Sequence, residues 1–228
     1  MSKRTTVRSH PERAHYDNQT FHQILDRAIV GHVCIVRDGL PHVVPMMIVR
    51  MADEVFIHCR AGTQLALDLA SGQSVAISIA TVRGIVFAKS VRYHAVNYDS
   101  LVIHGIPRFV STEDEKAKMF TRLVDHAWEG RSKSIRPPSR EELASVDVFA
   151  LNFSGSSAKI RRGGPAARLD RHPDDANFEN VWTGWADLTP CVTAFHPVIY
   201  PQDEGKAISH PDLKDKTTTV IGRWKGDK

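Results

Sequence analysis

The stretch from His32 to Cys59 limits the fold more than any other part of the chain, because runs typical of β-strands alternate there with turn signals. The first turn is Asp38-Gly39, a pair that favours a tight hairpin, and the second is Ala52-Asp53-Glu54. The runs themselves are HVCIVR, PHVVPMMIVRM and VFIHC. Short strands joined by such turns predict an antiparallel meander.

Further strands and a few helices complete the pattern. We expect strands over SVAISIA, over roughly 85–91 and 100–110, and over VDVFALNF. Apolar residues at helical spacing predict a helix from Asp17 to near Gly31, a short helix capped by Thr63, and a long one between Ser111 or Thr112 and Gly130; RPPSREELA adds a shorter helix. Strands and helices do not alternate as a doubly wound sheet requires, so we predict a mainly β fold with peripheral helices, an antiparallel barrel.

Composition fits one globular domain that binds no membrane. The chain has 228 residues, is 42% hydrophobic and carries a net charge of +4, with basic residues interleaved among acids, so a nucleic-acid partner is not indicated. Its longest apolar stretches are too short to span a bilayer. The three cysteines lie far apart, which predicts reduced thiols and a cytoplasmic location. We expect a polar leader over 1–16, a domain over 17–200 and a polar tail over 201–228.

Three clusters combine cations, hydroxyl groups and backbone amides in the way that phosphate recognition requires. They are residues 58–64, residues 89–100 and residues 159–164. The second cluster interrupts a run that otherwise looks like a buried strand, which favours an anionic ligand there. Each cluster on its own is also compatible with an ordinary solvated loop or strand edge.

Other chemistries lack their signatures. The chain has 12 histidines but no HExxH, HxH or paired Cys/His spacing, so most of the histidines are expected to be structural. GxSxG, the phosphate-binding GxxxxGK[ST] loop and the dinucleotide GxGxxG motif are all absent from the sequence. Trp182 and Trp185, on either side of Gly184, suit either stacking on a planar ligand or packing in the core.

Seven segments together resemble one known family. They are RAHYDNQTFHQILDRA, DGLPHVVPMM, FIHCRAGTQLALDLASG, GIVFAKSVRYHAVNYDSLVIHG, RPPSREELA, SSAKIRRGGP and VWTGWADL, spanning about Arg13 to Leu188. Their order and spacing resemble the pyridoxamine 5'-phosphate oxidase-like FMN-binding split barrels, in particular the flavin-nucleotide-binding branch that includes nitroimidazole-resistance proteins. The resemblance implies a six-stranded antiparallel split β-barrel that forms a homodimer, with FMN in a groove at the interface.

The resemblance also implies which residues contact FMN. The Pro45-Met46-Met47 strand would lie along the isoalloxazine ring, and the segment from His58 to Gln64 would approach the phosphate or ribityl chain. The full implied cofactor-binding set is Pro45, Met46, Met47, His58, Arg60, Thr63, Gln64, Lys89, Ser90, Asn97, Tyr98, Ser100, Lys159, Arg161 and Trp182. Gln64 and Asp99 stand where relatives commonly carry arginine, which predicts weaker FMN binding, another cofactor or none.

The implied function is an FMN-dependent oxidoreductase that acts on a small planar substrate, in which the flavin carries the electrons. Oxidation of pyridoxamine phosphate itself is not expected, because the C-terminal Arg-x-His cluster of the namesake enzymes is missing. The alternative is a haem- or flavin-binding protein that stores, senses or delivers its cofactor. His58 and His94 are the first haem-ligand candidates.

Overall fold

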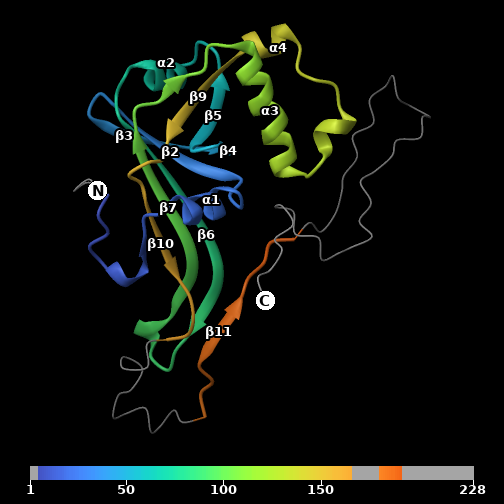
Figure 1. Cartoon of the computed structure of the whole chain (residues 1–228). Helices are drawn as coiled ribbons and strands as arrows, with labels where there is room; N and C mark the ends of the chain where they lie inside the picture. Colours follow the sequence, from blue (N-terminus) through green and yellow to red (C-terminus); the bar gives the residue numbers. More distant parts are fainter. Residues whose placement is uncertain (1–4, 166–179, 192–228) are drawn as a thin grey trace.

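Two antiparallel sheets form the body of the protein, shown by a computed structural model that describes residues 5–165 and 180–191 (Figure 1). The larger sheet has the strand order β1-β10-β7-β6-β2-β3, with β11 also paired to β6, and the smaller has the order β4-β5-β9-β8. The larger sheet consists of β1 (Ala14–His15), β2 (Val30–Arg37), β3 (Leu40–Met47), β6 (Val75–Phe87), β7 (Ala95–Gly105), β10 (Ser157–Arg161) and β11 (Gly184–Asp187). The smaller consists of β4 (Val49–Met51), β5 (Glu54–Arg60), β8 (Arg108–Phe109) and β9 (Val146–Asn152).

The predicted meander is confirmed. Asp38 and Gly39 both have positive φ, 52° and 77°, which is the backbone geometry that joins β2 to β3 in a two-residue hairpin. Along β2, Val33 and Ile35 are buried while their neighbours are more exposed, because successive side chains of a strand point to opposite faces. The mainly β class with peripheral helices is therefore confirmed.

The strand boundaries around β6 differ from the prediction. We expected two strands, SVAISIA and roughly 85–91, but β6 runs without a break from Val75 to Phe87. A register shift between Val82 and Gly84 lets the strand continue past Arg83 while it stays paired with β7. The strand then ends before Ser90, which caps the 3-10 helix η2 (Val91–Tyr93).

The helices begin at the predicted caps. Thr63 caps α2 (Gln64–Ala70) and Thr112 caps α3 (Glu113–Ala127), each by accepting a hydrogen bond from a backbone N–H in the first turn. Ser139 forms a capping box at α4 (Arg140–Ala144). Helix α1 (Asn18–Leu25) is shorter than predicted, because the chain has already entered β2 at Val30. Two further 3-10 helices are η1 (Pro11–Arg13) and η3 (Arg131–Ser134).

The apolar core has two parts, one on each face of the smaller sheet. One lies between the two sheets and includes Phe21, Ile57 and Leu101, all almost fully buried. The other lies between the smaller sheet and α3 and includes Phe56 and Met119. Figure 1 shows α2, α3 and α4 gathered at one end, while β6 and β7 extend away from them.

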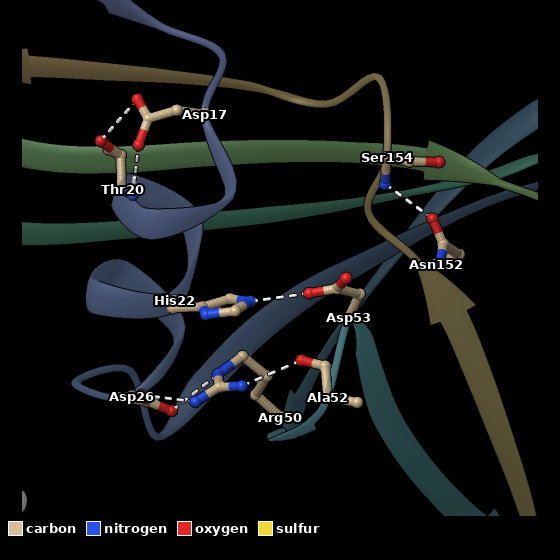
Figure 2. A network of polar contacts seen from close by, with 9 residues as sticks. All are labelled: Asp17, Thr20, His22, Asp26, Arg50, Ala52, Asp53, Asn152 and Ser154. Carbon is tan, nitrogen blue, oxygen red and sulfur yellow. Dashed lines mark hydrogen bonds and ion pairs between the residues drawn. The ribbon is translucent and has the colours of Figure 1, made fainter.

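A polar network fastens α1 to the turn between β4 and β5 (Figure 2). The His22 imidazole lies 2.8 Å from a carboxylate oxygen of Asp53, and Arg50 donates two hydrogen bonds to Asp26, at 2.9 and 2.8 Å. Arg50 also donates to the carbonyl of Ala52, a residue held at a positive φ of 49°. These contacts orient the turn, because Ala52 would otherwise disfavour this backbone conformation.

The ends of the chain are described only in part. Residues 14 and 15 of the predicted leader form β1, which pairs with β10. The predicted tail, 201–228, lies outside the described residues. None of the helices within the described ranges is long and apolar enough to cross a lipid bilayer.

Candidate functional site

A polar patch lies on the outer face of the larger sheet, on β7 and β10. Ser100 pairs directly with Lys159, and Tyr98 pairs with Arg161. Residues paired directly across two strands share a face of the sheet. Asp99 lies between Tyr98 and Ser100 on β7, so its side chain points to the opposite, buried face. Ser100 Oγ donates a hydrogen bond to the Lys159 carbonyl at 3.1 Å. We call Tyr98, Ser100 and Lys159 the β7–β10 patch.

Asn97 and Arg161 contact each other beside this patch. Arg161 Nη1 donates to Asn97 Oδ1 at 2.6 Å, and its guanidinium also donates to the carbonyls of Gly163 and Gly164. Asn97 is buried, and burial lowers the pKa of the Arg161 guanidinium. This pair therefore orders the turn after β10. Asn97 lies on the core side of β7, because it is buried and alternates with the more exposed Tyr98.

Lys89, Ser90 and Trp182 lie near the far end of the β6–β7 hairpin. Ser90 Oγ accepts a hydrogen bond from a backbone N–H of η2, which makes it a capping group. The Trp182 side chain is exposed and its ring centroid is 5.5 Å from that of Phe87, the last residue of β6. Lys89, Ser90 and Trp182 therefore lie at one end of the larger sheet, whereas Ser100 and Lys159 lie opposite Ala80, midway along β6 and β7.

The Pro45-Met46-Met47 segment lies elsewhere on the same sheet. It belongs to β3, the edge strand, which is separated from β7 by β2 and β6. Pro45 is exposed and pairs with His32 on the outer face, whereas the Met46 side chain enters the core. Among the described residues the outer edge of β3 has no strand partner, so its backbone N–H and C=O groups on that side make no ladder hydrogen bonds.

A third group of predicted residues surrounds the start of α2. Thr63 caps this helix and donates to the Arg60 carbonyl, and Gln64 donates to Asp68 at 3.2 Å. His58 differs from them, because its Nδ1 is buried without a hydrogen-bond partner. Burial lowers the pKa of this imidazole below its usual 6.5, because desolvation disfavours the charged form.

The three groups do not converge on one point within a single chain. The residues of the β7–β10 patch share the outer face of the larger sheet with Pro45. His58 lies instead in the smaller sheet, on the side that faces α3.

Asp99 lies at the centre of a charge cluster that the sequence did not predict. Its side chain is 4% exposed, and Arg83 and Arg27 approach its carboxylate at 3.5 and 3.9 Å. Arg162 makes a direct ion pair with the same carboxylate. Desolvation lowers the pKa of Arg27, and repulsion from Arg83 lowers it further. Asp99 thus meets three guanidinium groups on the core side instead of offering a bare negative charge to a phosphate.

A cavity of about 690 Å³ opens between α3, η3, α4 and β9. We call it the α3 pocket; its lining includes Phe120 and Val124 of α3, Pro137 and Val146, together with the cations Lys133 and Arg136. No sequence signal marks it, because these residues come from three separate segments. Within residues 5–165 and 180–191, no group of three or more His, Cys, Asp or Glu side chains is arranged to hold a metal ion.

Solved structures share this fold, and two at 26% identity are named for flavin and haem-type cofactors. The flavocytochrome Anf3 from Azotobacter vinelandii matches with a TM-score of 0.78 at 26% identity, covering 92% of this chain and 94% of its own. An FAD and haem binding protein from Mycobacterium smegmatis matches with a TM-score of 0.79 at 26% identity, covering 92% and 100%. A protein from Bacteroides thetaiotaomicron assigned to 5-nitroimidazole antibiotic resistance matches with a TM-score of 0.55 at 19% identity, covering 64% of this chain and 86% of its own. At this identity the match shows a shared fold alone.

The family itself follows from a comparison of sequences. No curated protein matches the chain. The family profile described as Pyridoxamine 5'-phosphate oxidase matches residues 17–160, more than half of the chain. This match and the structural neighbours confirm the resemblance and the split-barrel fold. The chain belongs to the pyridoxamine 5'-phosphate oxidase family.

Proposed function

We propose that the protein is a flavin-dependent oxidoreductase that acts on a small planar substrate. Family membership and two neighbours named for flavin binding, each aligned over 92% of this chain, support this proposal. The flavin, when bound, supplies the redox chemistry, and the chain's own residues bind and orient it.

The β7–β10 patch is the observation that carries the proposal. Lys159 brings a cation, while Tyr98 and Ser100 bring hydroxyl groups, and all three lie on one solvent-facing side of two paired strands. Charge-assisted hydrogen bonds of this kind are the strong contacts in phosphate recognition. The patch is therefore the proposed contact for a flavin phosphate.

A homodimer would complete the site. The outer face of the larger sheet also carries exposed apolar side chains, Val43 on β3 and Val82 on β6, opposite Tyr98 of the patch. Exposed apolar side chains on one sheet face suit an interface between chains. In the proposed arrangement, β3 of one chain lies along the flavin ring and the β7–β10 patch of its partner holds the phosphate. The three free cysteines support a reducing compartment, the cytoplasm.

Flavin titration tests the proposal. Tyr98→Phe combined with Lys159→Ala should weaken the binding of FMN or FAD by at least about tenfold, equivalent to about 1.4 kcal/mol. The matched control is Lys118→Ala, which removes an exposed cation from α3. Unchanged affinity in the double variant would place the phosphate elsewhere. Reoxidation of the reduced, flavin-loaded protein by a quinone then tests the oxidoreductase activity.

A haem- and flavin-binding protein without oxidase activity is the second candidate. Both neighbours at 26% identity have names that include a haem-type cofactor, a cytochrome or haem itself. His58, with its unpartnered buried nitrogen, is the observation in this chain that favours it. A Soret band after addition of haemin, without turnover of any electron acceptor, would select this candidate.

A further inference from the structure

Apolar side chains from three segments of the chain dominate the lining of the α3 pocket. Its volume of about 690 Å³ falls within the roughly 300–1,000 Å³ that is typical of pockets for small molecules. Phe120 and Val124 are one turn apart on α3 and therefore share a face of that helix. The other apolar lining residues are Ile135, Pro137, Pro138 and Val146. An apolar ligand body would leave water on entering this space, which favours binding.

The segment 132–138, which supplies much of the lining, is held near both of its ends. Near one end, Asp125 accepts hydrogen bonds from the backbone N–H and the hydroxyl of Ser132, at 2.8 and 2.7 Å. Towards the other end, Arg136 donates two hydrogen bonds to Glu142, at 2.8 and 2.7 Å. The two prolines that follow Arg136 fix their own backbone φ angles. A lining that is ordered before binding lowers the entropy cost of taking up a ligand.

The hydroxyl groups of the lining already donate their hydrogens to the chain itself. Thr121 donates to the Ala117 carbonyl at 2.9 Å, and Ser145 donates to the Glu142 carbonyl at 2.8 Å. Ser132 uses its hydroxyl hydrogen in the carboxylate contact given above. A sugar or a nucleoside would bring several polar groups that each need a partner, and these hydroxyls have no hydrogen left to donate. The lining therefore favours a ligand with few polar groups.

The charged residues of the lining comprise two cations and one acid, which leaves one positive charge in excess. Arg136 is compensated by Glu142, and the hydrogen bonds between them lower the pKa of Glu142 to about 2. Within residues 5–165 and 180–191, the Lys133 ammonium makes no ion pair. Hydrogen bonds from Ser132 lower the pKa of Asp125, and the charge of Lys133 lowers it further from beyond ion-pair distance. Lys133 is thus the cation placed to meet a negatively charged group of a ligand.

We propose that the α3 pocket binds an amphipathic organic monoanion, with its apolar body against Phe120 and Val124 and its single carboxylate or sulfonate at Lys133. Such a ligand matches the apolar lining, the occupied hydroxyls and the single excess charge together. The pocket lies on the α3 side of the smaller sheet, whereas the β7–β10 patch lies on the outer face of the larger sheet. The site is therefore separate from the proposed flavin contact, and its ligand is a second small molecule.

Two fluorescent probes with the same aromatic body test the charge. 8-Anilino-1-naphthalenesulfonate carries one negative charge, and N-phenyl-1-naphthylamine is its uncharged counterpart. Each is titrated into the full chain, and we expect one bound probe per chain. Lys133→Met should weaken the sulfonate by about fivefold and change the neutral probe by less than about twofold, because it removes only a partly exposed ion pair. Lys118→Met is the matched control, since it removes an exposed cation of α3 outside the pocket and should change neither probe.

Filling the pocket tests its location. Val124→Trp should weaken both probes by at least about tenfold, and Thr121→Trp, at an exposed lining position, gives the same test if the first variant folds poorly. Probe binding that survives both substitutions, or that is equally sensitive to Lys133→Met and Lys118→Met, would overturn the proposal, as would a chain that binds neither probe. FMN titration of the same variants should give unchanged affinity, so that a failure of the pocket and a failure of the proposed flavin site are told apart.

Discussion

Replacing Asp99 by asparagine should destabilise the protein strongly, because it removes the one carboxylate that three arginines share. The Asp99 side chain is 4% exposed, while those of Arg27, Arg83 and Arg162 are 23%, 30% and 48% exposed. Removing one partner of a fully buried pair costs about 3–5 kcal/mol, and a surface pair contributes about 0–1 kcal/mol. With a buried acid and half-buried bases, we expect the free energy of unfolding to fall by about 2–3 kcal/mol.

Urea unfolding at pH 7 measures this effect. With a denaturant slope of about 2–3 kcal/mol per molar, the midpoint should fall by about 1 M. Asp114→Asn is the matched control, because it breaks an exposed ion pair with Lys118 on α3 and should leave the midpoint unchanged. Adding Arg83→Gln to Asp99→Asn should recover part of the loss, since it removes an uncompensated charge. If Asp99→Asn loses no more than Asp114→Asn, the cluster does not stabilise the fold as argued.

Three further substitutions test other parts of the structure. Lys116→Met removes a buried ammonium that donates to the carbonyls of Leu143 and Val146, and should lower the unfolding free energy by about 1–3 kcal/mol in urea; equal stability would show that these contacts add nothing. Gly84→Ala would place a Cβ 2.6 Å from the Ala186 carbonyl oxygen, so β11 should detach from β6 and raise the exposure of Trp185 above its present 48%, seen as a further red shift of tryptophan emission; an unchanged spectrum would contradict the close approach of these two strands. Because the pKa of His58 is lower in the folded state than its usual 6.5, the unfolded state binds the proton first as the pH falls. The unfolding free energy of the wild type should therefore drop from pH 7 towards the folded-state pKa. His58→Leu should remove that part of the drop, and identical pH profiles of the two proteins would refute the shift.

Local chemistry made much of the fold predictable from the sequence. The Asp38-Gly39 hairpin and the Thr63 cap depend on residues a few positions apart, and both form as expected. The end of α1 and the continuity of β6 were predicted wrongly. Two strands were expected there, yet a register shift between Val82 and Gly84 accommodates Arg83 within one strand that pairs with β7 on both sides of it.

The sites were harder to predict because they depend on contacts between distant segments. The sequence pattern around Asp99 showed a charge among polar residues, but Arg27 and Arg162 reach it from other parts of the chain. The α3 pocket likewise joins Phe120 to Val146 across a helix, a turn and a strand. Asn97 and Ser100 are close in the sequence and were predicted to contact the same ligand. In the structure they lie on opposite faces of β7, because Asn97 is buried and Ser100 faces outward beside Lys159.

The most direct test of the account is the visible absorption spectrum of the protein after incubation with FMN or FAD and removal of unbound flavin, recorded together with its mass in solution. A twofold-symmetric dimer has two equivalent sites, so we expect oxidised-flavin bands corresponding to roughly one flavin per chain, on a particle with the mass of two chains. A particle that retains neither FMN nor FAD under these conditions would contradict the proposed flavin-dependent function.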